Sequence, residues 1–160
     1  MRRLLLMRHG KAASPAGVED FDRPLADAGH VEAAEAGAWI AEHVGAVDAV
    51  LCSPARRTRE TLAATGIDAP ATFRDEIYQG WTGDLLDVVR SVSPDAGTVL
   101  LVGHSPGTPS LAARLAGEDS DPALVNRVRA GFPTASVAVL EITVAWAELE
   151  AGGACLAHLR

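Results

Sequence analysis

Hydrophobic and polar positions follow two kinds of pattern along the chain. Short apolar runs, bounded by turn-forming or charged residues, are typical of strands that are buried on both faces of a sheet. Longer segments with apolar residues at helical spacing separate these runs. The apolar runs predict strands at Arg3–Met7, Val47–Cys52, Thr98–Val102, Ser136–Ile142, Ala145–Glu150 and Ala154–His158.

The segments between the strands predict helices. The longest runs from Asp27 to about Val44 and is rich in alanine. We expect its buried stripe to contain the apolar residues at helical spacing, which are Val31, Ala34, Ala38 and Ala41, with Trp39 and Ile40 broadening it. A second helix should begin near Ser53-Pro54, because serine is a favoured N-cap and proline a favoured first helical residue. Two shorter helices are predicted at Asp84–Val92 and Thr108–Leu115. The segment Asp75–Gly83 is expected to be irregular.

This order of elements indicates an α/β fold. Strands that alternate with helices favour a mainly parallel central sheet between two helical layers, which is a three-layer sandwich. Near the C-terminus, Glu150–Gly153 is typical of the turn of a β-hairpin between the last two strands. A chain of 160 residues can bury a substantial core as one unit, so we expect a single domain over residues 1–160.

Composition narrows the possible partners. A net charge of −7 disfavours a nucleic-acid partner, but a few arginines can still dominate a crevice that binds phosphate. The apolar run Leu4–Met7 is too short to span a bilayer or to act as a secretory signal, so we expect a cytoplasmic protein with no membrane partner. Cys52 and Cys155 have no metal-binding spacing, and we expect neither a metal nor a cofactor.

Arginine and histidine residues follow three of the predicted strands. Arg8 and His9 follow the first strand, Arg57 lies shortly after the second, and His104 follows the third. The carboxyl ends of parallel strands meet at one edge of a sheet, where open α/β folds bind their ligands. Two guanidinium groups and two imidazoles would neutralise a phosphoryl group from several directions without a metal. The sequence therefore predicts a phosphate site at this edge.

Four motifs, taken together, resemble those of the histidine phosphatase superfamily, which shares its fold with the cofactor-dependent phosphoglycerate mutases. They are Leu6-Met7-Arg8-His9-Gly10, Arg23-Pro24-Leu25, Ser53-Pro54 followed by Arg57, and Gly103-His104-Ser105. The short length, the early Arg-Pro-Leu and the compact middle are most similar to the SixA-type phosphohistidine phosphatases. The resemblance covers essentially the whole chain and implies a phosphoglycerate mutase-like fold.

The resemblance also implies a role for each matching residue. His9 would be the nucleophile, which attacks phosphorus and forms a phosphohistidine intermediate that water then hydrolyses. Arg8 and Arg57 would hold the phosphoryl oxygens, and His104 would donate to them as charge builds. Ser105 could add a further donor. The implied activity is a metal-independent phosphatase whose substrate is a phosphohistidine-bearing protein.

The segment Asp75–Gly83, which follows the second predicted strand, indicates a general acid less clearly. Glu76 stands four residues before Gly80 and loosely fits the position of a general acid in many members of the superfamily; the alternative is a solvated residue near the rim. Tyr78 could line the entrance or anchor the segment. Arg23 could tie its own loop to the body through an ion pair, since Asp20 and Asp22 are close in the sequence.

Two other functions stay open at this point. A small-molecule phosphomonoesterase of the same superfamily would use the same residues, so the partner could be a small phosphate ester. A non-catalytic module that binds phosphate or phosphopeptides would be expected to lack at least one of Arg8, His9, Arg57 and His104, and all four are present. The residues with which the mutases recognise their substrate are absent, because Lys11-Ala12-Ala13 follows the first motif.

Overall fold

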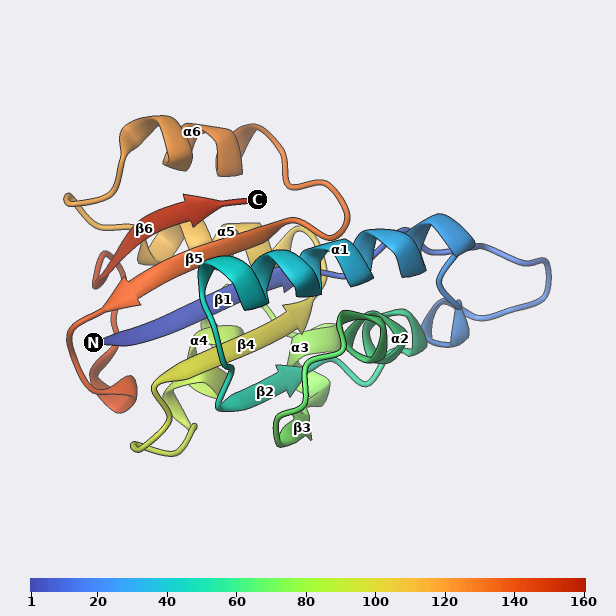
Figure 1. Cartoon of the computed structure of the whole chain (residues 1–160), viewed down its shortest axis with the longest axis horizontal. Helices are drawn as coiled ribbons and strands as arrows, with labels where there is room; N and C mark the ends of the chain where they lie inside the picture. The colour runs from blue at the N-terminus through green and yellow to red at the C-terminus, as the bar shows by residue number, and fades with distance from the viewer.

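The computed structural model describes residues 1–160 and contains one six-stranded sheet (Figure 1). The strand order is β3-β2-β4-β1-β5-β6. The first four strands of this order are parallel to one another, β5 is antiparallel to β1, and β6 pairs with β5 as a C-terminal hairpin. The strands are β1 Arg2–Arg8, β2 Ala49–Cys52, β3 Ala71–Phe73, β4 Thr98–Gly103, β5 Val137–Ile142 and β6 Ala154–Leu159.

Helices cover both faces of this sheet, which confirms the predicted α/β sandwich. In Figure 1, α1 crosses the near face, whereas α4 and α5 lie behind the sheet. Helix α2 packs against α1, and α6 packs against α5 and the edge strand β6. The helices are α1 Asp27–His43, α2 Arg56–Thr65, α3 Asp75–Gln79, α4 Thr82–Arg90, α5 Gly107–Leu115 and α6 Pro122–Ala130, with short 3₁₀ helices η1 Asp20–Asp22 and η2 Trp146–Glu148.

The central strands are buried on both faces, which explains their continuous apolar runs. Successive side chains of a strand point to opposite faces. In β1, Leu5 and Met7 join the cluster under α1, while Leu4 and Leu6 join the larger cluster with α4 and α5. All four are fully buried, and burying such a side chain contributes roughly 2 kcal/mol. This packing fixes where β1 ends, and therefore where the motif after it begins.

Most of the predicted buried stripe of α1 is wrong, although its member Ile40 is fully buried. Val31 is 57% exposed, and Ala34, Ala38 and Ala41 are exposed as well. The buried face consists of Ile40 together with Ala33, Ala36 and Gly37. A side chain at Gly37 would collide with the backbone of Thr65, so small residues let α1 lie against the end of α2. Close helix packing, rather than the count of apolar residues, selects this face.

Three other local predictions differ from the structure. The strand expected at Ala145–Glu150 is the 3₁₀ helix η2, where the buried Trp146 ring donates from Nε1 to the carbonyl oxygen of Ala96 at 2.8 Å. The hairpin therefore joins β5 to β6, with η2 in the connection. The segment expected to be irregular contains helix α3, and the helix expected to begin at Ser53-Pro54 begins at Arg56.

The edge strand β3 and helix α6 did not appear in the sequence prediction. All three residues of β3 are exposed, so the strand carries no apolar run. Helix α6 begins with Asp121 as its N-cap and Pro122 in its first turn, a pattern typical of helix starts. None of the helices in the fold has the length and apolar character that a membrane span requires.

Candidate active site

The ends of three parallel strands lie level with one another and bring the motifs together. Arg8 of β1 pairs with Gly103 of β4, and Cys52 of β2 pairs with Val102 of β4. The chain leaves each strand within a residue or two of these pairs. In Figure 1 the arrowheads of β1, β2 and β4 point to the same end of the sheet, where the loop between β1 and α1 extends. The topology thus places the predicted residues at one edge.

Glycine allows the turn after β1 to rest directly on the start of α1. A side chain at Gly10 would meet the carbonyl oxygen of Gly29, and a side chain at Gly29 would collide with the carbonyl oxygen of Lys11. The same Lys11 oxygen accepts a hydrogen bond from the backbone N–H of Ala26 at 2.9 Å. The backbone next to His9 is therefore held against the first turn of a helix, which fixes the direction of the imidazole.

A cavity of about 350 Å³ opens at this edge and is rich in cationic side chains. It contains all four residues that the strand ends predicted, together with Ser105. No carboxylate lines it. The lining residues are Arg8, His9, Lys11, Ala12, Arg23, Arg57, His104, Ser105 and Thr134. Such a lining suits a phosphoryl group, whose negative charge it would neutralise from several sides.

His9 is held as a neutral imidazole with a defined tautomer. His9 is only 8% exposed, and its Nδ1 lies 2.7 Å from the carbonyl oxygen of Gly10. Because a carbonyl can only accept, Nδ1 carries the proton and donates it, and Nε2 keeps a free lone pair. Burial is the main cause that lowers the pKa of His9 to about 4; the Gly10 hydrogen bond opposes it, and the charges of Arg57 and Arg8 add to it. A neutral imidazole is the nucleophilic form.

His104 lies beside His9 and is neutral for the same reason. The two ring centroids are 5.3 Å apart. Burial, followed by the charge of Arg57, lowers the pKa of His104 to about 3. Its Nε2 lies 2.7 Å from the hydroxyl oxygen of Ser53, while Nδ1 is buried and has no partner within the protein. Ser53 is fully buried, and the backbone N–H of Ala55 donates to its hydroxyl at 3.3 Å. Ser53 therefore positions His104, a role that the sequence motif alone did not show.

Arg8 and Arg57, the two arginines expected to bind phosphate, are anchored by acceptors of the protein. Arg8 donates from Nη1 to the carbonyl oxygen of Phe132 at 3.0 Å. Arg57, only 6% exposed, donates from Nη1 to the carbonyl oxygen of Asp20 at 2.6 Å and from Nη2 to its Oδ2 at 3.1 Å. The Nε of each arginine is buried and has no partner. Since a guanidinium has five N–H groups, each arginine is fixed in place and still has donors to offer an anion.

Asp20 and Tyr78 form an outer layer around Arg57. Asp20 accepts a hydrogen bond from the Tyr78 hydroxyl at 2.8 Å and another from Arg23 Nη1 at 3.1 Å. Arg23 thus forms an ion pair with Asp20, but both residues lie in the same loop, and it is the pair of Asp20 with Arg57 that links this loop to α2. These hydrogen bonds, that of Tyr78 first, lower the pKa of Asp20 to about 2. The Tyr78 ring stands edge-on to His104, with centroids 5.6 Å apart, so Tyr78 belongs to the site rather than only to its own segment.

Glu76 does not lie in the cavity. Its carboxylate is exposed and pairs with Arg74, with Nη2 and Oε1 2.9 Å apart. The hydrogen bond from Arg74 lowers the pKa of Glu76, whereas a general acid needs a raised pKa. Ser105, in contrast, is exposed at the cavity wall, where its side chain is accessible to a ligand.

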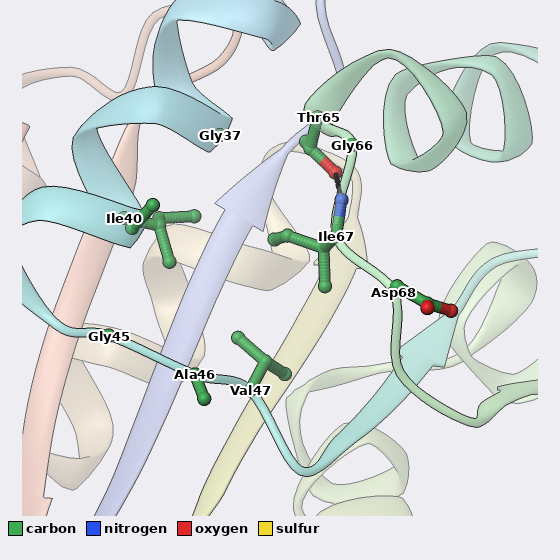
Figure 2. Close-up of a pocket in the computed structure, with 10 residues that line it drawn as sticks. Gly37, Ile40, Gly45, Ala46, Val47, Thr65, Gly66, Ile67 and Asp68 are labelled. Carbon is green, nitrogen blue, oxygen red and sulfur yellow. Dashed lines mark hydrogen bonds between the residues drawn. The ribbon is translucent and has the colours of Figure 1, made fainter.

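A second hollow lies away from these groups, near the C-terminal ends of α1 and α2 (Figure 2). Its volume is about 210 Å³, and Ile40, Val47 and Ile67 point into it from three segments. It has no imidazole or guanidinium, and Asp68 is its one ionisable residue. This lining does not suit an anionic ligand, so the cavity at the strand ends is the candidate active site.

Comparison with known proteins agrees with this assignment. A family model for the histidine phosphatase superfamily (branch 1) matches residues 4–79. An uncharacterised protein of Mycobacterium tuberculosis is 46% identical over 151 residues, which make up 94% of this chain and 96% of that protein. A protein of Nakamurella multipartitia assigned as the phosphohistidine phosphatase SixA has a structure with a TM-score of 0.91 at 43% identity; the match covers 99% of this chain and 95% of that one.

A second structure, from Agrobacterium tumefaciens, carries the same SixA assignment. It has a TM-score of 0.77 at 32% identity, over 88% of this chain and 91% of that chain. These likenesses confirm the phosphoglycerate mutase-like fold and the resemblance to SixA that the four motifs predicted. The chain therefore belongs to the histidine phosphatase superfamily, in its SixA-like group, and is a phosphatase.

Proposed function

We propose that this phosphatase removes the phosphoryl group from phosphohistidine in a protein, through a phosphorylated His9 and without a metal ion. The observation that carries the proposal is the state of His9: a neutral ring, with its Nδ1 proton held by Gly10, in a cavity lined by four cationic side chains. A neutral imidazole with a free Nε2 is ready to attack phosphorus, and the arginines supply the positive charge that a metal ion would otherwise provide.

The reaction would proceed in two displacements. The lone pair of His9 Nε2 forms a bond to phosphorus, while the bond from phosphorus to the substrate nitrogen breaks and its electrons return to the departing imidazole. Water then attacks the phosphorylated His9, and the released Nε2 regains its lone pair. Arg8 and Arg57 would neutralise the phosphoryl oxygens throughout, and loss of one such donor typically costs about a hundredfold in rate. His104 would contact the same oxygens from beside His9.

The protonation states around the cavity favour a nitrogen leaving group. An alkoxide leaving group needs a general acid, which is usually a carboxyl with a raised pKa. Here no carboxyl lines the cavity, and the pKa values of Asp20 and Glu76 are lowered. The imidazole of phosphohistidine can carry its own proton on the distal nitrogen and so leaves as a neutral ring. The SixA assignment of the two related structures agrees with this substrate class.

A small-molecule phosphomonoesterase is the second candidate. A cavity of about 350 Å³ can hold a small phosphate ester, and Lys11 and Arg23 at its wall could bind a second anionic group of such a substrate. The two candidate functions use the same His9 and arginines and differ only in the leaving group of the substrate.

The experiment is incubation with a protein carrying radiolabelled phosphohistidine, in the presence of a chelator. We expect phosphate release by the wild type and by His30→Ala, a control on the exposed face of α1, but not by His9→Ala. A short-lived, acid-labile label on the wild-type enzyme would support phospho-His9. Turnover of an aryl phosphate without release from phosphohistidine would favour the second candidate. Inactivity towards both would refute catalysis and support a phosphate-binding module.

A further inference from the structure

Asp20 is an unusual neighbour for a phosphate site. Its carboxylate contacts two of the cavity's arginines, Arg23 and Arg57. The Arg57 side chain is 8% exposed, whereas that of Asp20 is 55% exposed, so the carboxylate covers the guanidinium on its solvent side. Asp20 thus lies against two arginines of the cavity wall, with its carboxylate accessible from solvent.

A negative charge at this place opposes the binding of a phosphoryl dianion. The carboxylate repels the phosphoryl group of the substrate. It also competes with that group for the N–H groups of Arg57, since Nη2 already donates to it. Support of Arg57 does not require a charge, because the backbone carbonyl of Asp20 already accepts the shorter hydrogen bond, at 2.6 Å. The charge is permanent at neutral pH, since the pKa of Asp20 is lowered to about 2. These observations indicate that the charge of Asp20 acts on the leaving group of the substrate rather than on the bound phosphoryl group.

The carboxylate also has spare hydrogen-bonding capacity. An ionised carboxylate offers about four acceptor positions on its two oxygens. Oδ2 accepts from Arg57 and Tyr78, while Oδ1 accepts only from Arg23. One acceptor position of Oδ1 is therefore free on a half-exposed side chain.

We propose that Asp20 is a specificity-determining residue that accepts a hydrogen bond from the distal ring N–H of phosphohistidine and thereby favours cleavage of its P–N bond over cleavage of phosphate esters. This inference rests on the proposed function. When the distal nitrogen carries a proton, the electrons of the P–N bond return to the proximal nitrogen and a neutral imidazole leaves. Without that proton the ring would have to leave as an anion, which is far less stable. The carboxylate stabilises the protonated ring, and no proton moves in the step.

Phosphate esters gain nothing from this carboxylate. Their leaving oxygen acquires negative charge as the P–O bond breaks, and a second negative charge nearby opposes that change. An acidic phosphometabolite would be repelled in addition through its own carboxylate. Any loss of support for Arg57 would lower the activity towards both kinds of substrate. The effect of the Asp20 charge is therefore measured as the ratio of the activity towards phosphohistidine to that towards a phosphate ester.

The test compares two substrates in two variants. Values of kcat/KM are measured for a phosphohistidine peptide and for para-nitrophenyl phosphate, whose nitrophenolate leaves without a proton. Asp20→Asn removes the charge and keeps the shape. Asp22→Asn is the matched control, because Asp22 lies in the same 3₁₀ helix, is exposed and makes no side-chain hydrogen bond or ion pair. Activity towards the aryl phosphate also reports whether Asp20→Asn is folded.

We expect Asp20→Asn to lower the ratio of phosphohistidine to aryl phosphate activity by about tenfold or more, as befits loss of a hydrogen bond to a charged group, and Asp22→Asn to leave it unchanged. Equal losses on both substrates would overturn the inference, since Asp20 would then only position Arg57. A wild type that hydrolyses the aryl phosphate but not the peptide would overturn the proposed function, and the inference with it. That result is visible before any variant is measured.

Discussion

Lowering the pH from about 7 to about 5 should destabilise the folded protein, because two buried imidazoles stay neutral in it. The pKa of His9 is lowered from 6.5 to about 4 and that of His104 to about 3. At pH 5 the unfolded chain binds a proton at each of these positions, and the folded chain binds almost none. Integrating this difference between the two pH values gives a loss of about 2 kcal/mol for each histidine, or about 4 kcal/mol for the pair.

The direction of the pKa shifts determines whether the stability rises or falls with pH, and over which pH range it changes. A lowered pKa means that stability falls as the pH drops below 6.5, and that the loss due to His9 levels off below about 4, where the folded state binds the proton too. The lowered pKa of Asp20 acts in the same direction but in a more acidic range, because the stability that it contributes is lost between about pH 3.8 and 2. The interval from pH 7 to 5 therefore isolates the histidines.

Denaturation by urea at the two pH values measures the effect. The emission of the buried Trp146 and the far-ultraviolet circular dichroism together report unfolding. A loss of about 4 kcal/mol is a large part of the 5–15 kcal/mol typical of a domain, so the midpoint should move clearly. The control is the double variant His9→Asn/His104→Asn, which should lose much less between the same pH values. An equally large loss in that variant would refute the reasoning, since the titrating groups would then lie elsewhere.

Three further substitutions test how the site is built. Gly29→Ala should lower kcat by about a hundredfold, because the new methyl group displaces the loop next to the nucleophile. Gly83→Ala, also in the first turn of a helix, should have little effect, because its methyl group would only touch the end of the Arg114 side chain at 3.8 Å. Ser53→Ala should lower kcat by about tenfold by releasing the ring of His104, and Ser53→Thr should restore part of the activity. Glu76→Gln should change kcat/KM by less than about threefold on either substrate, because the carboxylate is exposed and outside the cavity.

Much of the fold could be predicted because its central strands are buried on both sides. In β1 and β4 every second residue faces one helical layer and the rest face the other, so both strands appear as unbroken apolar runs. Where burial is one-sided or absent, this signal fails. The edge strand β3 has no buried residue, and η2 was mistaken for a strand because Trp146 and its apolar neighbours form a short run. Short apolar runs do not distinguish a strand from a helical turn.

The four central residues of the site could be predicted for the same reason. Arg8 ends a buried strand, His9 and His104 directly follow one, and Arg57 lies in the first turn of the helix after another, so topology alone brings them to one edge. Their supporting residues had no such signal. Tyr78 and Asp20 are 58 positions apart, and their hydrogen bond depends on how the short helices η1 and α3 pack over Arg57. No local period or motif encodes a contact of that kind.

The carboxylates around the site connect its electrostatics to the choice of substrate. Asp20 is held ionised by Tyr78, Arg23 and Arg57, and Glu76 by Arg74, so neither is suited to give a proton to a departing group. A phosphatase with these protonation states needs leaving groups that depart as stable anions or that already hold a proton. Phosphohistidine meets the second condition through its distal nitrogen, whereas an ordinary alkyl phosphate meets neither. Under the proposed function, the charges that hold Arg57 in place would therefore also favour the P–N bond as the one to be broken.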